Sequence, residues 1–339
     1  MSATLDIEDP AALVAYLSLT GRIAHDEEPT VRTLAGGVSN KTVLVERPTG
    51  ESWVLKQALP KLRVKVDWFS DPARIRREAL ALRWLPELAP KGSITPLVFE
   101  DPDHFLLAMQ AVPQPHENWK TMLLTGRKLF PRHAQQFGAL LGRIHRSASK
   151  RRHELAPLFD DRTFFETLRI EPYYAFTAEQ VPAAGPFLHA LIEETRATRE
   201  TLVHGDYSPK NVLVPKGGRI VLLDHEVIHW GDGAFDLGFA MAHFLSKANH
   251  LPNHRGAFGA AVMRFWSGYM RQGPALGSGL RQRAVRHALA CLLARVAGRS
   301  PLEYLTADER ARQVDAVLDL MQSPPKIHAD LVLKFLDRL

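Results

Sequence analysis

The chain reads LVHGDYSPKNVLVPKGGRIVLLD from Leu202 to Asp224, and this stretch decides the fold that we expect. Two apolar runs, at 212–214 and 220–223, flank the segment Pro215-Lys216-Gly217-Gly218. Apolar runs joined by a short segment of glycine and proline are typical of a β-hairpin. The sequence therefore predicts a hairpin in which the entry of the first strand lies beside the exit of the second.

Three oxygen-bearing side chains fall at the open end of this hairpin. Asn211 precedes its first strand, and Asp224 follows its second strand. Asp206 lies five residues before Asn211, on a loop interrupted by glycine and proline. Carboxylate and amide oxygens suit a hard cation such as Mg2+ together with a phosphate. Local turn chemistry explains any one of these residues, whereas a metal and phosphate site explains all three.

The composition is that of an ordinary globular protein. Of the 339 residues, 45% are hydrophobic and 24% are charged, and the net charge is +6. The single cysteine, Cys291, excludes an internal disulfide framework and is expected to be a buried thiol in a reducing compartment. Because the sequence has neither a long apolar run nor a basic and apolar leader, we expect a cytoplasmic protein with no membrane partner.

Basic residues gather at three places, 61–65, 74–77 and 150–152. One interpretation is that they form solvated faces of helices and loops. The other is that they attract an anionic ligand such as a nucleotide. The sequence shows no zinc-ligand spacing, no paired aromatic platform and no basic tail, so no nucleic-acid partner is expected.

A glycine pair interrupts the strands predicted for the first part of the chain. A helix over 10–19 and strands over 31–34, 42–46 and 52–57 are expected, with Gly36 and Gly37 between the first two strands. Adjacent glycines permit tight backbone geometry and a close approach of amides to a phosphate. An ordinary turn is the alternative explanation of the same pair.

Lys56 ends the apolar run of the strand at 52–57, where a lone lysine would ordinarily be exposed. The next predicted helix, capped by Ser70 or Asp71, places Glu78 on its buried face. That face is traced by the apolar residues Ile75, Ala79, Leu82 and Leu85. A buried carboxylate needs a cationic partner to offset its desolvation. We therefore expect an ion pair between Lys56 and Glu78.

A boundary between two lobes is expected near residue 112. Strands dominate up to a predicted strand at 105–109, and helical stripes dominate afterwards, for example at 137–144, 285–296 and 327–335. We predict an α+β, bilobal fold with a small antiparallel-sheet lobe over 1–112 that binds the nucleotide. A larger, mainly helical lobe over 113–339 is expected to carry the catalytic and metal-binding loops and the acceptor site. The cleft between the lobes is the expected ligand site.

These parts together resemble a kinase. A glycine loop, a strand lysine, a helical glutamate, a loop Asp with Asn five residues on, and an Asp after a hairpin recur in protein kinases. Here, however, His204-Gly205-Asp206 stands in place of His-Arg-Asp, and Asp224-His225-Glu226 stands in place of Asp-Phe-Gly. The protein-kinase Ala-Pro-Glu segment is absent.

With GGVSN at 36–40 and GDGAFDL at 231–237, the chain resembles the aminoglycoside phosphotransferase-like small-molecule kinases over roughly residues 30–245. That family includes choline kinase and methylthioribose kinase, and the resemblance implies a bilobal, protein-kinase-like fold. Residues 56–64, KQALPKLRV, also look like methylthioribose kinase. Those enzymes tend to have Ser where this chain has Asn211, so their substrate is not carried over.

The resemblance implies that ATP and Mg2+ are the cofactors and that the γ-phosphate passes to a hydroxyl of a small molecule such as a sugar or amino alcohol. Asp206 would accept or orient the proton of that hydroxyl. Lys56, oriented by Glu78, would bind the α- and β-phosphates. The metal ligands would be Asn211, Asp224 and Glu226.

The resemblance also implies a set of nucleotide contacts. The amides of the glycine loop would cover the β- and γ-phosphates, and they belong to Gly36, Gly37, Ser39 and Asn40. Adenine would lie between Val45 and Leu213, with the backbone of Gln110 and Val112 at its edge. Asp236 and His204 would brace the Asp206 loop, while Lys210 would face either a phosphate or open water.

The acceptor is the least constrained part of this prediction. Its pocket is expected in the helical lobe, with Tyr207, Trp230 and Arg295 as candidates. An antibiotic acceptor is less expected, because the basic chain gives no sign of an acid-rich cleft. Two alternatives stay open: a non-catalytic nucleotide-binding scaffold on the same fold, and a protein kinase. The protein is expected to be a monomer or a homodimer.

Overall fold

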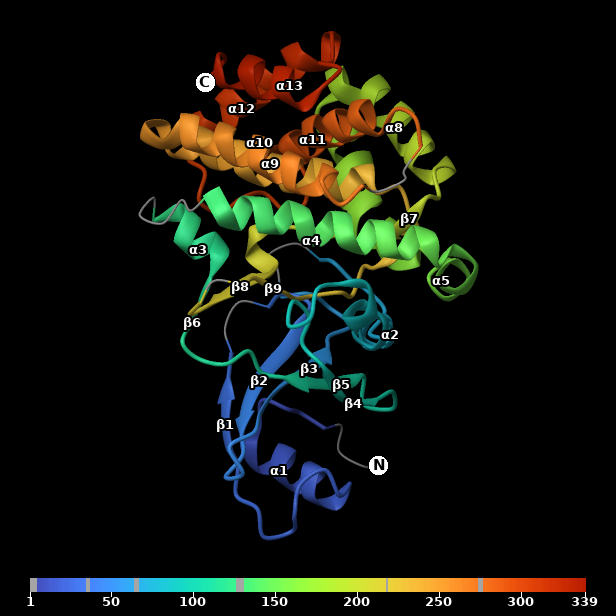
Figure 1. Ribbon diagram of the computed structural model, residues 1–339, viewed down its shortest axis with the longest axis vertical. Coiled ribbons are helices and arrows are strands. Elements are labelled where there is room, and N and C mark those ends of the chain that lie inside the picture. The colour runs from blue at the N-terminus through green and yellow to red at the C-terminus, as the bar shows by residue number, and fades with distance from the viewer. Residues whose placement is uncertain (1–4, 35–36, 64–66, 126–130, 218, 274–276) are drawn as a thin grey trace.

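Two lobes make up the computed structural model, which describes residues 5–34, 37–63, 67–125, 131–217, 219–273 and 277–339. A small lobe contains an antiparallel sheet, and the larger lobe is mostly helical (Figure 1). The predicted α+β, bilobal architecture is therefore confirmed.

The sheet of the small lobe has five antiparallel strands in the order β1-β2-β3-β5-β4. The strands are β1 (Thr30–Thr33), β2 (Asn40–Glu46), β3 (Ser52–Ala58), β4 (Leu97–Asp101) and β5 (Leu106–Gln110). Four of them match predicted strands. Strand β4 was not predicted, because it contains only three apolar residues and ends in Glu100 and Asp101.

Both faces of this sheet are buried, each against one helix. On one face, Leu106 and Ala108 pack with α1 (Pro10–Leu19). On the other, Leu107 and Met109 pack with α2 (Arg74–Leu88). Successive side chains of a strand point to opposite faces, so this alternation in β5 supplies both contacts.

Helix α2 begins later than the sequence predicted. Neither Ser70 nor Asp71 caps it, since the residue before the first turn is Ala73 and no side chain bonds there. Asp71 instead accepts a hydrogen bond from the Ala73 amide at 2.8 Å, within the turn that precedes the helix. The predicted buried stripe of the helix, with Glu78 in it, is confirmed.

The helical lobe is organised around long helices that cover the expected apolar stripes. Helices α4 and α10 approach closely because Gly138 and Gly268 lie at their contact, where a Cβ atom would collide with backbone of the other helix. Helix α9 packs along α11, and both belong to the same continuous core. The helices of this lobe are α3 (Trp119–Leu124), α4 (Pro131–Lys150), α5 (Arg152–Leu158), α6 (Thr163–Phe165), the π-helix η1 (Glu166–Ala175), α7 (Phe176–Gln180), η2 (Pro182–Ala184), α8 (Gly185–Ala197), η3 (Pro209–Asn211), α9 (Ala234–His250), η4 (Pro252–His254), α10 (Arg255–Met270), α11 (Leu280–Ala297), α12 (Ala307–Gln322) and α13 (His328–Leu336).

The predicted hairpin is present in the helical lobe, on the side that faces the small lobe. Strands β8 (Val212–Pro215) and β9 (Val221–Leu222) pair antiparallel, with Val212 opposite Leu222. Strand β6 (His116–Asn118) extends this small sheet, and β7 (Thr201–Val203) pairs separately with β10 (His229–Gly231). The hairpin thus lies where the two lobes meet (Figure 1).

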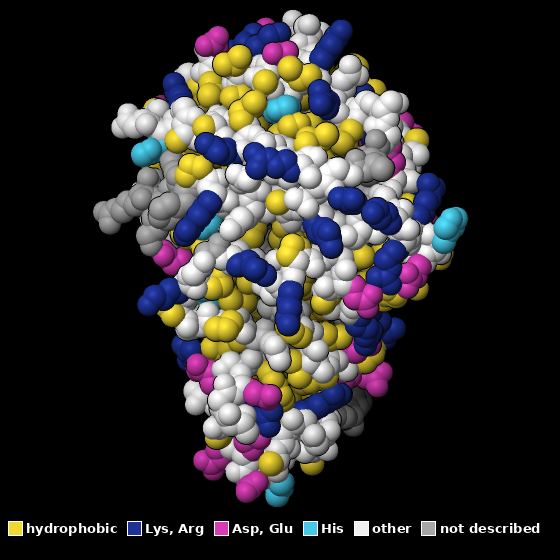
Figure 2. All heavy atoms as spheres, in the orientation of Figure 1, with side chains coloured by type: hydrophobic (Ala, Val, Ile, Leu, Met, Phe, Trp, Pro, Cys, Tyr) yellow, Lys and Arg dark blue, Asp and Glu magenta, His cyan; other side chains and the backbone are white. Residues whose placement is uncertain are grey.

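The surface reflects the net charge of +6. On the face shown in Figure 2, Lys and Arg side chains lie across the middle of the helical lobe, and Asp and Glu side chains lie mainly at its margins and on the small lobe. Within the described ranges, no helix combines the length and apolar character needed to cross a membrane.

Candidate active site

The loop that carries Asp206 is fastened to helix α9. One carboxylate oxygen of Asp236 accepts a hydrogen bond from the His204 amide at 2.7 Å, and the other accepts one from the Gly205 amide at 2.9 Å. Gly205 has a φ of +78°, a conformation that favours glycine. Asp236 is fully buried. The predicted bracing role of Asp236 is therefore confirmed.

A pair of buried histidines supports the same loop. The Asp206 amide donates to His204 Nδ1 at 3.2 Å, and His204 Nε2 lies 3.2 Å from His225 Nδ1. Burial lowers the pKa of both rings, so both are neutral near pH 7. His204 is thus a buried scaffold residue, as predicted, and it connects the Asp206 loop to the segment after the hairpin.

The carboxylate of Asp206 has two side-chain partners. Asn211 Nδ2 donates to Asp206 Oδ2 at 2.8 Å, so the Asn211 amide oxygen is the atom left for a cation. Arg169 Nη2 lies 3.1 Å from the same Oδ2 atom. Arg169 also donates to the Gly205 carbonyl at 2.6 Å and lies on the π-helix η1. Sequence analysis missed Arg169, because irregular helix η1 has no simple periodicity that would place this side chain inward.

Lys56 contacts one carboxylate of its own lobe, Glu78, and one of the opposite lobe, Asp224. Its ammonium lies 2.7 Å from Glu78 Oε1 and 2.9 Å from Asp224 Oδ1. The predicted Lys56–Glu78 ion pair is therefore present, and Asp224 shares the same cation. Asp224 has a φ of +67°, which is unfavourable for a non-glycine residue and is typical of strained functional positions.

One ammonium between two carboxylates produces opposite pKa shifts. Burial lowers the pKa of Lys56, but the charges of Asp224 and Glu78 outweigh it and raise the pKa above its ordinary value. Burial raises the pKa of Glu78 to about 7, although Lys56 opposes the shift. For Asp224 the attraction of Lys56 and Lys210 outweighs burial and lowers the pKa. Asp224 therefore carries the more persistent negative charge.

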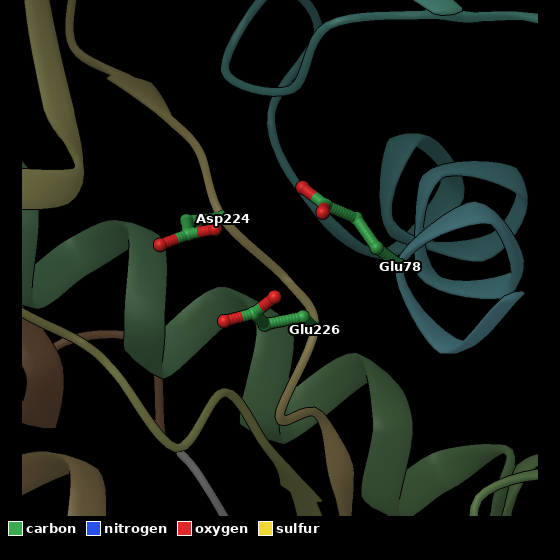
Figure 3. A group of neighbouring side chains, drawn as sticks. All are labelled: Glu78, Asp224 and Glu226. Carbon is green, nitrogen blue, oxygen red and sulfur yellow. The ribbon is translucent and has the colours of Figure 1, made fainter. Parts of the chain in front are cut away.

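Three carboxylates form a candidate cation site. Ligand oxygens of Glu78, Asp224 and Glu226 all lie within 4.8 Å of one another, and Figure 3 shows the three groups pointing toward a common space. Glu78 Oε2 is buried with no hydrogen-bond partner among the described residues. Hard oxygen ligands of this kind fit Mg2+. The predicted ligands Asp224 and Glu226 are thus brought together, while the side chain of the third, Asn211, bonds to Asp206 instead.

Arg74 is a buried residue near the site, so the interpretation of the 74–77 group as a solvated face does not hold for it. Its Nε atom donates to Glu226 Oε2 at 3.1 Å, and its other nitrogens donate to the backbone carbonyls of Ser39 and Leu59. Arg74 is fully buried. It lies one turn before Glu78 on the same face of α2, and this spacing is the signal that could have identified it.

The glycine loop rests on this arginine. The Ser39 carbonyl accepts from Arg74 and from the Leu59 amide, and the Val38 carbonyl accepts from the Arg63 amide. The backbone amides of Gly37, Val38 and Ser39 donate no hydrogen bond to other described residues. Gly36 lies outside the described residues. The side chain of Asn40 donates to Glu226 Oε2 at 3.2 Å, so it joins the loop to the opposite lobe.

The adenine prediction needs one correction. Val45 is fully buried on the sheet face that packs against α1, away from Lys56. Leu44 is paired with Val54, two residues before Lys56 in the same strand, so Leu44 lies on the cleft face. A shift of one residue along a strand moves every side chain to the other face, and the prediction erred by that one residue.

Gln110 and Val112, the residues expected at the adenine edge, lie at and just after the end of β5. The Gln110 amide already donates to the Pro96 carbonyl at 2.9 Å, so only its own carbonyl remains for a ligand. Gln110 and Val112 also line a cavity of about 470 Å3. Leu213 is half-buried on β8 of the hairpin.

The expected acceptor residues divide into core and site. Tyr207 is fully buried, stacks on Phe137 with ring centroids 4.0 Å apart, and is therefore core rather than pocket lining. Trp230 is 1% exposed and is also core. Arg295 is half-buried and donates to the Tyr173 hydroxyl at 2.8 Å. Lys210 is exposed, yet it lies close enough to Asp224 to lower the pKa of that carboxylate.

Comparison with known proteins places this geometry in context. The sequence profile described as the phosphotransferase enzyme family matches residues 30–276. Methylthioribose kinase of Citrobacter koseri is 26% identical over 286 residues, which cover 71% of this chain and 70% of that protein. Methylthioribose kinase of Enterobacter sp. is 24% identical over 236 residues, covering 62% of this chain and 58% of that protein.

Solved structures share the fold at low sequence identity. The amicoumacin kinase hAmiN, solved with AMP-PNP, Ca2+ and its ligand Ami, is 16% identical, with a TM-score of 0.55 over 88% of this chain and 89% of that one. Choline kinase LicA from Streptococcus pneumoniae is 15% identical, with a TM-score of 0.54 over 92% and 98% of the two chains.

Proposed function

The chain belongs to the phosphotransferase enzyme family, and we propose that it transfers the γ-phosphate of ATP to a hydroxyl group of a small molecule. The observation that carries the proposal is the shared cation: Lys56 of the small lobe contacts both Glu78 and Asp224, 2.7 and 2.9 Å away. This arrangement holds an ammonium where nucleotide phosphates would enter. We also propose that the lobe before about residue 112 binds the nucleotide and that the lobe after it binds the acceptor.

In the proposed reaction, an acceptor hydroxyl oxygen forms a bond to the γ-phosphorus. The bond from that phosphorus to the β,γ-bridging oxygen breaks, and its electron pair leaves with ADP. The hydroxyl proton passes to the Asp206 carboxylate and then to solvent. Arg169, at 3.1 Å, and Asn211, at 2.8 Å, hold that carboxylate in a fixed orientation. Positioning of this kind supplies most of the catalysis in phosphoryl transfer.

The nucleotide would be held by groups from both lobes. The amides of Gly36, Gly37, Ser39 and Asn40 would face its β- and γ-phosphates, and Lys56 would face the α- and β-phosphates. A bound divalent cation would offset charge on the transferring group. Asp224 and Glu226 would hold that cation, with the Asn211 oxygen as a third ligand, and Glu78 would keep Lys56 in place.

The direct test compares Asp206→Asn with the native chain. Asparagine preserves the size of the side chain but removes the acceptor of the proton, so we expect turnover to fall by about 100-fold or more. ATP binding, measured by calorimetry with Mg2+, should be unchanged. The exposed Asp103→Asn variant is the matched control and should retain full activity.

Two results would contradict the proposal in different ways. Normal turnover of Asp206→Asn would remove Asp206 from the reaction. Binding of Mg2+-ATP without phosphate transfer to any member of a broad hydroxyl-compound library would favour a non-catalytic nucleotide-binding protein instead.

A further inference from the structure

A second group of polar side chains lies in the helical lobe, and the reaction as described above does not use it. We call it the donor cluster, and it consists of Lys120, Lys247, Arg295 and Tyr304. These residues come from α3, α9, α11 and the segment after α11. The ammonium groups of Lys247 and Lys120 lie 5.3 and 5.9 Å from the centroid of the Tyr304 ring.

Three residues of this cluster have buried donor atoms with few acceptors, while Lys120 is partly exposed and pairs with Glu303. Lys247 is 1% exposed, and its one recorded hydrogen bond is to the His243 carbonyl at 3.2 Å. Tyr304 Oη and Arg295 Nε are both buried with no partner among the described residues. Leaving a desolvated donor unpaired costs free energy, so such groups usually have a partner in the functional state.

The cluster contains more cations than anions. Burial together with the nearby cations Lys120 and Arg295 lowers the pKa of Lys247 to about 7, while Glu303 opposes the shift. Two acids lie near the cluster: Glu303 pairs with Lys120 while its side chain remains 65% exposed, and Glu309 lies near Tyr304. No carboxylate pairs with Lys247 within the described ranges. An anion would supply the missing acceptors and the missing charge together.

A series of side-chain contacts connects the donor cluster to the proposed catalytic carboxylate. Arg295 Nη1 donates to the Tyr173 hydroxyl at 2.8 Å, and the guanidinium carbon of Arg169 lies 5.6 Å from the centroid of the Tyr173 ring. Arg169 in turn contacts Asp206 at 3.1 Å. By a separate route, α3 with Lys120 packs against η3, which ends at Asn211. Two side chains therefore separate the cluster from Asp206.

Building on the kinase function proposed above, we propose that the acceptor is anionic: a hydroxy compound that carries a carboxylate or phosphate group, which the donor cluster binds while its hydroxyl faces Asp206. Lys247, Arg295 and Tyr304 supply donors to the anionic group. Glu303, which is exposed, moves off Lys120 when the acceptor enters. The positive cluster disfavours cationic acceptors such as polyamine antibiotics.

The test uses matched pairs of acceptors that differ in the anionic group. D-gluconate is compared with D-glucitol, and ribose 5-phosphate with ribose, in an assay of ADP release with Mg2+-ATP. The anionic member of at least one pair should show a kcat/KM at least 10-fold higher than its neutral partner. Which pair responds distinguishes a carboxylate from a phosphate.

Variants connect that preference to the cluster. Lys247→Met should raise KM for the anionic acceptor about 10- to 100-fold, because a charge-assisted hydrogen bond is lost, while KM for ATP stays constant. Removing an unpaired buried ammonium should not unfold the chain, and circular dichroism checks this. Glu303→Gln should lower KM for the anionic acceptor, because the competing carboxylate is gone. Exposed Lys334→Met on α13 is the control.

Equal kcat/KM values within every pair, or an unchanged acceptor KM in Lys247→Met, would overturn the inference while leaving the kinase function intact. If none of these four compounds is phosphorylated, the kinase function is decided by the broad library described above. Calorimetric titration with the anionic compounds then tests the anion-binding site independently of turnover. Binding that weakens in Lys247→Met supports the site, and the absence of binding overturns it.

Discussion

Replacement of Arg74 by methionine tests whether the glycine loop is held in place by a buried cation. Methionine keeps an unbranched apolar stem, so the packing of α2 changes little. The substitution removes the partner of Glu226, which lies 3.1 Å away, and donors to the carbonyls of Ser39 and Leu59. Arg76→Met, two residues further along α2 and exposed, is the matched control.

The magnitude follows from the burial of the pair. Arg74 is fully buried, and the Glu226 side chain is 9% exposed. Removing one member of a buried ion pair costs about 3–5 kcal/mol, because the other charge is left without compensation. We therefore expect Arg74→Met to lower the free energy of unfolding by about 4 kcal/mol, a large part of the roughly 5–15 kcal/mol typical of a folded protein. The control should change it by less than about 0.5 kcal/mol.

Urea unfolding followed by circular dichroism measures both variants. A double variant, Arg74→Met with Glu226→Gln, isolates the interaction, because the loss should then be smaller than the sum of the two single losses by at least about 1 kcal/mol. KM for ATP should rise in Arg74→Met, since the Ser39 carbonyl loses one of its two hydrogen-bond donors and keeps only the Leu59 amide. The reasoning is refuted if Arg74→Met is as stable as Arg76→Met, or if the two single losses simply add.

Three further predictions concern charge and protonation. Burial lowers the pKa of His229 from 6.5 to about 4, so the unfolded chain binds a proton more readily than the folded chain. The free energy of unfolding should therefore fall by about 2 kcal/mol between pH 6.5 and pH 5. Urea unfolding should show a smaller fall in His229→Phe. Asp236→Asn should lower both turnover and melting temperature, because the side-chain NH2 group, a donor, would then face the backbone N–H of His204 or of Gly205, which is also a donor. A stable variant with native turnover would contradict the bracing role. Chelation of divalent cations by EDTA should abolish phosphate transfer. Added Mg2+ should restore transfer in the native chain but not in Asp224→Asn. Transfer that persists in EDTA would contradict the cation site.

Much of the site could be predicted because its residues belong to short local patterns. The spacing of Asp206, Asn211 and Asp224 around one hairpin required only that the two apolar runs pair. The ion pair of Lys56 and Glu78 followed from the cost of burying a carboxylate. In each case, one local rule and one energetic argument were sufficient.

The errors came from information that local patterns do not contain. Val45 was placed toward adenine instead of Leu44, because the face of a strand depends on which neighbour covers it, and here α1 covers one face. Tyr207 and Trp230 were assigned to a pocket, but the packing of distant helices buries both. Arg74 was grouped with exposed arginines, since burial of a cation depends on acceptors that lie far away in the sequence, such as Glu226.

The contact between Asn40 Nδ2 and Glu226 Oε2, 3.2 Å apart, joins the end of the glycine loop, where β2 begins, to the segment that follows the hairpin in the opposite lobe. Under the proposed function, a nucleotide bound beneath the glycine loop would lie behind this contact, and we expect release of ADP to require that the contact break. If release of ADP limits turnover, weakening the contact with Asn40→Ala should make the catalytic cycle faster.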